Sequence, residues 1–292
     1  PWARSGMVKI PYSMCEVKDV ESGTTSYVLS EGELFAADVP PNGYKTFVVL
    51  ADIKVTIPIS TNSSFDTPFF RVAFDLKRGG IASLMDKRTV RELVDQSSPY
   101  ALGQFLHERF DQQQMLAFHN AYGRPGYSWL KGNLPTNTVY AALTPPAWTF
   151  AAHRTDAADV ATLTATDARD LAKDITLVFT LHRHQPSVDV EWRVTDKTPD
   201  PMPEGGWLCF PFAVAQPQFL LGRLGGPIDP AKDIVAGANR HYFCLNTGLT
   251  ITGQDGAGIG LCPLDSSCVS LDEPGLWKFS LDYTPKKPSA FV

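Results

Sequence analysis

Short stretches of alternating apolar and polar residues, separated by Gly, Pro, Asn and Asp, run along the whole chain. The clearest example lies between Asp174 and Asp196, where Gln185-Pro186-Ser187 supplies a turn. Its apolar positions are Ile175, Leu177, Phe179 and Leu181 before the turn, and Val188, Val190, Trp192 and Val194 after it. Successive strand side chains point to opposite faces, so this pattern predicts an antiparallel hairpin with one face on a core.

Comparable segments recur at short intervals and predict many further strands. We expect them at 27–29, 33–35, 45–50, 69–76, 140–143, 147–153, 159–165, 206–213, 241–251, 259–262 and 268–271. Many short strands with regular turn signals are typical of an all-β sandwich or barrel. One short helix is expected at 111–122, with Asp111 as its N-cap.

Composition limits the function classes that need to be considered. Of the 292 residues, 43% are hydrophobic, which is enough to form a substantial core. No window approaches the roughly 18 consecutive apolar residues of a membrane helix, so we expect no membrane span. The formal net charge is −5 and Lys and Arg form no block, so we expect no nucleic-acid partner.

The chain opens on Pro1 and stops at Val292 without a helix cap or a polar run, and we expect it to be a segment of a longer polypeptide. The polar stretch Ser60–Ser64, between Pro58 and Pro68, is the best candidate for a domain boundary. We therefore expect a small β unit over 1–58 and a large β domain over 59–292.

Five cysteines occur, at positions 15, 209, 244, 262 and 268, and an odd number leaves at least one without an intramolecular partner. No CxxC pair is present, which argues against a zinc ribbon. Cys262 and Cys268 could close a small loop in an oxidising compartment. The alternative that we favour is free thiols buried in strands.

Two stretches resemble a known family. The first runs Phe69-Phe70-Arg71-Val72-Ala73-Phe74-Asp75, then Gly79-Gly80-Ile81-Ala82-Ser83-Leu84-Met85-Asp86-Lys87. It is similar to the opening of the C-terminal β region of glycoside hydrolase family 38 α-mannosidases and their relatives. The second, Asn239–Phe243 with Gly258–Asp265, resembles the later half of relatives whose function is unassigned. The resemblance implies a galactose-mutarotase-like supersandwich that follows a small β unit.

The hairpin of the first stretch also has a purely physical interpretation. Gly79 and Gly80 would supply positive-φ positions in a tight turn. Ile81 and Leu84 would be buried, whereas Asp86 and Lys87 would cap an exposed strand end. The motif therefore indicates architecture and carries little chemistry.

In the family, the zinc ligands, the nucleophile and the acid/base carboxylate lie in an N-terminal α/β barrel, and no part of that barrel is present here. No catalytic or metal-binding position can be carried over, so we expect no cofactor in this chain and zinc in the absent barrel. The resemblance implies an accessory region that scaffolds the barrel, its partner, and lends loops to a carbohydrate cleft. For the whole parent protein it implies retaining, metal-assisted hydrolysis of α-mannosides.

One aromatic, glycine-rich segment suits carbohydrate. It contains Tyr122, Arg124, Tyr127 and Trp129. Aromatic faces stack on sugar rings and Arg bonds their hydroxyls, so we place these four side chains in a substrate site. An ordered loop at a domain interface is the alternative.

Arg240, Tyr242 and Asp265 form a second candidate cluster for substrate contact. The alternative for these residues is an Arg–Asp pair that holds two loops together.

His182 and His184 share one strand face with Asp189 and Glu191 of the next strand. Such a set could bind a metal or a sugar, and it is also what a solvated sheet face looks like. Two further function classes stay open: a free-standing carbohydrate-binding module, and an aldose-epimerase-like enzyme using His182 or His184 with Glu191.

Overall fold

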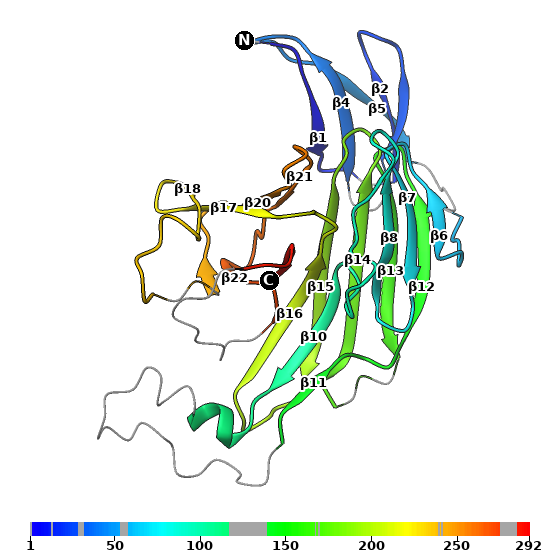
Figure 1. The fold of residues 1–292 in the computed structure, drawn as a ribbon. Helices are drawn as coiled ribbons and strands as arrows, with labels where there is room; N and C mark the ends of the chain where they lie inside the picture. The colour runs from blue at the N-terminus through cyan, green and yellow to red at the C-terminus, as the bar shows by residue number, and fades with distance from the viewer. Residues whose placement is uncertain are drawn as a thin grey trace.

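The computed structural model describes residues 2–12, 14–28, 32–52, 58–116, 139–166, 168, 170–238, 240, 242–274 and 285–292. In these parts the regular secondary structure consists almost entirely of strands in antiparallel sheets (Figure 1), which confirms the predicted all-β sandwich class. Within the same residues, no helix has the length and apolar character needed to cross a membrane.

A short helix begins where the sequence predicts it. Residues 112–116 are helical, and Asp111 Oδ1 accepts a hydrogen bond from the Gln114 amide at 2.8 Å. The Gln114 side chain reaches back to the Asp111 amide at 3.2 Å, so the two residues form a capping box. The rest of the expected helix, 117–122, lies outside the described residues.

The predicted hairpin forms one side of a four-stranded sheet, in which its second arm is an edge strand. The strands, in order across the sheet, are β12 (Ala147–Arg154), β13 (Ala158–Thr166), β14 (Ala172–His182) and β15 (Val188–Lys197). Leu177 lies opposite Trp192, and Phe179 lies opposite Val190. The apolar positions of β14 are fully buried in the main core, as the alternation predicts.

A six-stranded sheet carries the candidate site. Its order is β11 (Ala141–Leu143), β10 (Gln104–Arg109), β16 (Glu204–Pro211), β23 (Ser289–Phe291), β22 (Cys268–Leu271) and β19 (Tyr242–Cys244). One face joins the main core through Phe105 and Phe210. The other face carries a separate small cluster of Leu106, Trp207, Cys209 and Phe291. Strand β10 is therefore covered on both sides.

Two more four-stranded sheets complete the large β part. One contains β6 (Ser64–Asp66), β7 (Phe70–Asp75), β8 (Gly80–Asp86) and β9 (Arg91–Glu92), and the other β18 (Gly226–Ile228), β17 (Gln218–Arg223), β20 (Leu249–Thr252) and β21 (Gly258–Leu261). The single strand expected at 241–251 is wrong, because β19 and β20 belong to different sheets. The chain changes sheet between them, where Asn246 Oδ1 accepts a hydrogen bond from the Leu224 amide at 2.8 Å.

The Gly79-Gly80 hairpin differs in part from the expectation. Only Gly79 has a positive φ, +71°, whereas Gly80 already belongs to β8. Position 80 requires glycine for another reason: a Cβ there would lie 2.8 Å from the Leu102 carbonyl oxygen. Ile81 is buried as predicted. Asp86 does not cap an exposed strand end, because it is only 5% exposed and binds Arg88.

The Asp86–Arg88 ion pair predicts that the stability of the fold depends on pH. The Arg88 guanidinium, 2.8 Å from Asp86 Oδ2, holds the pKa of that carboxyl below its usual value. Such a group stabilises the fold above its unfolded pKa, about 3.9, and this contribution is lost as pH falls through the lower folded pKa. We expect Asp86→Asn to lower the urea midpoint at pH 6. The difference in urea midpoint between the variant and the wild type should become smaller towards pH 3. A difference that stays constant over this range would contradict the assignment; Asp265→Asn, at an exposed carboxyl, is the control.

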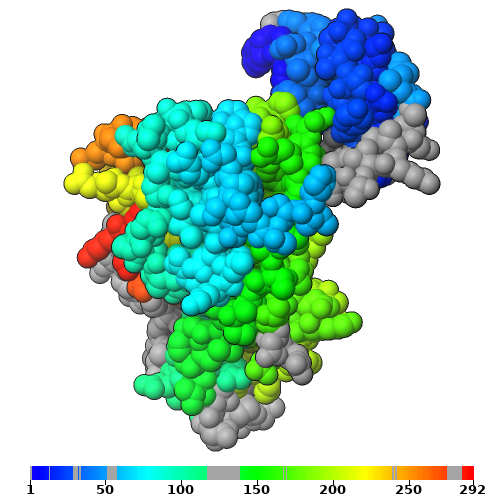
Figure 2. Space-filling view, turned by 90° about the vertical axis from the view of Figure 1, so that its right-hand side faces the viewer, coloured from blue at the N-terminus to red at the C-terminus, as the bar shows by residue number. Residues whose placement is uncertain are grey.

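Residues 2–52 form two small sheets of their own. They are β1 (Arg4–Lys9) with β4 (Glu33–Val39), and β3 (Thr25–Val28), β2 (Cys15–Asp19) and β5 (Phe47–Asp52). Cys15, Val17, Val28 and Leu34 form a hydrophobic cluster separate from the main core. Figure 2 shows this N-terminal part, in blue, projecting from one end of the molecule. The division into 1–58 and 59–292 stays a prediction.

Candidate functional site

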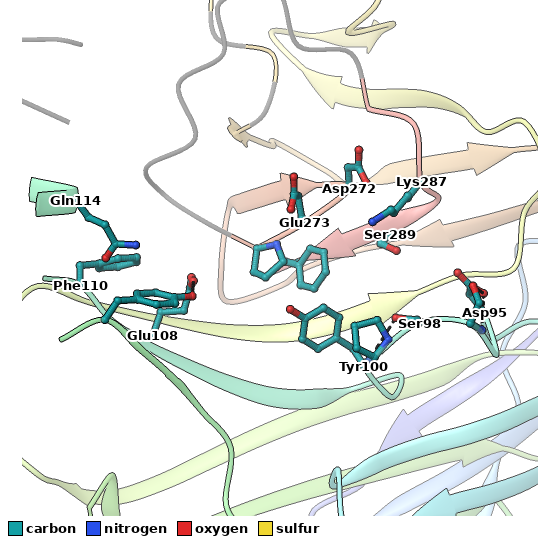
Figure 3. A pocket seen from close by; sticks show the side chains of 15 residues that line it. Asp95, Ser98, Tyr100, Glu108, Phe110, Gln114, Asp272, Glu273, Lys287 and Ser289 are labelled. Atoms are coloured by element: carbon teal, nitrogen blue, oxygen red, sulfur yellow. Dashed lines mark hydrogen bonds between the residues drawn. The ribbon is translucent and has the colours of Figure 1, made fainter. Parts of the chain in front are cut away.

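A cavity of about 580 Å³ opens on the face of the six-stranded sheet that is turned away from the main core. This volume lies within the roughly 300–1,000 Å³ typical of small-molecule sites. Figure 3 shows Glu108 and Tyr100 on one wall, with Asp272, Glu273 and Lys287 across from them. The walls therefore come from β10 and the segment before it, and from the chain that follows β22 and enters β23.

Glu108, on β10, is the most buried carboxylate of the pocket, at 3% exposure. Tyr140 Oη donates to its Oε1 at 2.7 Å, and Trp207 Nε1 donates to its Oε2 at 2.7 Å. In the described part of the chain no Lys, Arg or His forms an ion pair with it. Because both donors are neutral and each carboxylate oxygen has two lone pairs, Glu108 can accept further hydrogen bonds from a ligand.

The pKa values of both tyrosines in the pocket are raised. Burial, together with the nearby Cys209 and Glu108, raises the pKa of Tyr100 to about 12. Burial and the hydrogen bond to Glu108 raise the pKa of Tyr140 well above its usual value. Both phenols therefore carry their protons at neutral pH. Tyr100 is held edge to face against Phe291, with ring centroids 5.4 Å apart.

The charge of the lining favours one class of ligand. Among the described residues, the lining of the cavity contains four carboxylates, those of Asp95, Glu108, Asp272 and Glu273, and one cation, Lys287. Negative potential in a cleft repels phosphorylated and carboxylated ligands. Carboxylate acceptors, phenolic donors and aromatic rings instead suit a neutral ligand with many hydroxyl groups.

Of the residues that the sequence singled out, the three that the structure describes, Arg240, Tyr242 and Asp265, do not line this pocket. Tyr122, Arg124, Tyr127 and Trp129 lie outside the described residues. Arg240 Nη2 donates to the Ile234 carbonyl at 2.8 Å, and no ion pair joins Arg240 to Asp265, which is exposed. Tyr242 packs edge to face on Trp207, with centroids 6.2 Å apart, and thus lies beside the cluster beneath the pocket.

The His182, His184 and Glu191 set is divided among separate partners. His182 Nε2 lies 2.8 Å from Asp189 Oδ2. His184 bonds the Asp156 carbonyl at 2.9 Å and stacks on Phe35 of the N-terminal part, with ring centroids 3.8 Å apart. Glu191 pairs with Arg193. Across the described ranges, no three His, Cys, Asp or Glu side chains are placed to hold a metal ion. His184 therefore helps to join the N-terminal sheets to the large β part.

Sequence reasoning missed Glu108 because it missed β10. All but the last residue of this strand are buried, so the apolar-polar alternation that marks a half-buried strand is absent. No local signal marked Glu108 either, because its neighbours in the sequence are the polar residues His107 and Arg109, as at many exposed positions.

Comparison with known proteins adds no relative. No family model matches the chain, and no curated protein sequence is significantly similar to it. The assignment of function therefore rests on the pocket and on the motifs of the first hairpin.

Proposed function

We propose that this chain is a saccharide-binding accessory region of an α-mannosidase-like glycoside hydrolase, and that it holds a neutral sugar in the Glu108 pocket. One observation carries the proposal: a buried carboxylate, held by two neutral donors, at a cavity that also presents phenols and further carboxylates. The resemblance of the Gly79–Lys87 hairpin to family 38 α-mannosidases supports the choice of family.

Sugar hydroxyls both donate and accept hydrogen bonds, and the pocket offers each counterpart. Glu108 and Asp272 are acceptors and the protonated Tyr100 is a donor, whereas Tyr140, whose proton goes to Glu108, can accept a hydrogen bond through its oxygen. Aromatic rings cover the apolar face of a sugar ring and fix its orientation. In this proposal the chain binds and positions the saccharide, while zinc and the catalytic carboxylates belong to the barrel.

The N-terminal part supports an accessory role. Nine of the nineteen exposed large apolar side chains of the described residues lie within 2–52. They are Trp2, Val8, Tyr12, Val20, Tyr27, Tyr44, Val48, Val49 and Leu50. This concentration of exposed apolar side chains in one small part of the molecule supports a role in packing on another body. The partner that we propose is a catalytic barrel on the same or a companion polypeptide.

Calorimetric titration with methyl α-mannoside and α-linked mannobiose tests the pocket. We expect binding, and we expect mannose 6-phosphate to bind more weakly because the lining is acidic. Glu108→Gln should raise Kd at least about tenfold, since a hydrogen bond to a charged group contributes about 1.5–3 kcal/mol. Asp265→Asn, which changes an exposed carboxylate outside the pocket, should leave Kd unchanged.

Two results would reject the proposal. The first is no binding of the wild-type chain to any neutral saccharide, by calorimetry and on a glycan array. The second is hydrolysis of an aryl α-mannoside by this chain alone that stops when a chelator is added. If Asp265→Asn weakened binding while Glu108→Gln did not, the sugar would lie elsewhere than in this pocket.

A further inference from the structure

Two cysteines face each other on neighbouring strands of the six-stranded sheet. Cys244 on β19 is in register with Cys268 on β22, and their sulfur atoms lie 3.8 Å apart. The next pair is hydrogen-bonded, because the Leu245 amide donates to the Ser267 carbonyl at 2.6 Å. Cys244 and Cys268 thus form a non-hydrogen-bonded pair, in which Cα atoms approach to about 4.5 Å. A disulfide needs a Cα separation of about 4.4–6.8 Å, so this pair can be bridged with little backbone movement.

Cys244 and Cys268 also differ from the other three cysteines in combining access to solvent with a neighbouring thiol. Cys244 is exposed and Cys268 is half-buried, so a dissolved oxidant can reach the pair. Cys15 and Cys209 are buried in strands. Cys262 is also exposed, but it is the sulfur of Cys244 that lies next to the sulfur of Cys268. The small loop considered between Cys262 and Cys268 is therefore the less favoured link.

We propose that Cys244 and Cys268 form a reversible cross-strand disulfide when the protein meets a disulfide oxidant such as oxidised glutathione. The Cys244 thiolate attacks one glutathione sulfur, and the first glutathione thiolate leaves. The Cys268 thiolate then attacks the Cys244 sulfur of this mixed disulfide and releases the second glutathione. The protein loses two electrons and two protons, and the oxidant becomes two reduced glutathione molecules.

The bond would act on one edge of the sheet. Strand β19 is the last strand in the order, and β22 is its neighbour. Cys268 shares a face with Ser270, and the chain leaves β22 at Leu271 and continues directly into Asp272, which lines the pocket. Oxidation would thus fasten the edge strand to the strand that leads into this wall. This inference rests on sheet geometry and does not depend on the proposed function.

Thiol titration of the denatured protein, with peptide mapping, tests the bond. After the reduced full chain is incubated with oxidised glutathione, free thiols should fall from five to three, and the peptides that contain Cys244 and Cys268 should be linked. Cys262→Ser is the matched control and should still lose two thiols. Cys244→Ser and Cys268→Ser should form no internal link.

Urea unfolding provides a second measurement. The oxidised wild type should unfold at a higher urea midpoint than the reduced protein, and addition of a reductant should reverse the shift. The same treatment should leave the midpoint of Cys244→Ser unchanged. The proposal is overturned if the wild type gains only glutathione adducts, or if the link involves Cys262.

Discussion

Gly79→Ala is expected to lower the free energy of unfolding by about 3 kcal/mol. A left-handed backbone costs an L-residue roughly 1–2 kcal/mol, and Gly79 has φ +71°. A methyl group there would also overlap the buried indole of Trp148, and overpacking of a core adds roughly 1–3 kcal/mol. The ring cannot move aside easily, because Trp148 is part of the main core.

Gly256→Ala is the matched control for this substitution. Gly256 has φ +75°, nearly the same as Gly79, but a Cβ at this position meets nothing within 4 Å. We therefore expect a cost of about 1–2 kcal/mol, from the backbone alone. Urea denaturation of both variants measures the difference. Equal midpoints for the two would show that the Trp148 indole yields to the methyl group.

Trp207→Phe is expected to cost about 2–3 kcal/mol and to weaken saccharide binding. The phenyl ring keeps most of the packing beneath the pocket, but the Nε1 donor 2.7 Å from Glu108 Oε2 is lost. Trp207 is 4% exposed, so water does not readily replace the donor. A buried charged group that loses a partner costs about 1.5–3 kcal/mol.

Tyr140→Phe removes the other donor to the same carboxylate. Tyr140 is 38% exposed, so solvent can replace its hydroxyl, and we expect a loss of about 1 kcal/mol or less. Urea denaturation compares the two variants, and calorimetry follows binding. If Tyr140→Phe lowers the free energy of unfolding more than Trp207→Phe does, the Tyr140 hydroxyl is the more important hydrogen-bond donor to Glu108.

The alternation between Asp174 and Asp196 predicted its hairpin correctly because the sheet buries one face there. Leu177 and Phe179 point into the main core, whereas Thr176 and Thr180 do not. The start of the helix was predicted equally well, because a cap depends on residues within one turn. The same local logic failed at Gly80, where the constraint is a distant carbonyl, that of Leu102.

The pocket could not be predicted in this way, since its parts are distant in the sequence. Glu108 meets the indole of Trp207, 99 residues further on, through the pairing of β10 with β16. No local pattern encodes that pairing. The aromatic residues that stood out, Tyr127 and Trp129 among them, did so through composition, which says nothing about where a loop lies.

Because β10 is buried on both faces, it should not tolerate the insertion or deletion of a residue. Phe105 points into the main core, and Leu106 points into the cluster beneath the pocket. Inserting or deleting one residue early in this strand would exchange the two faces and turn Glu108 towards the large apolar core. Length changes should therefore be tolerated far less in β10 than in the exposed turn at Gly256, whatever residue is added.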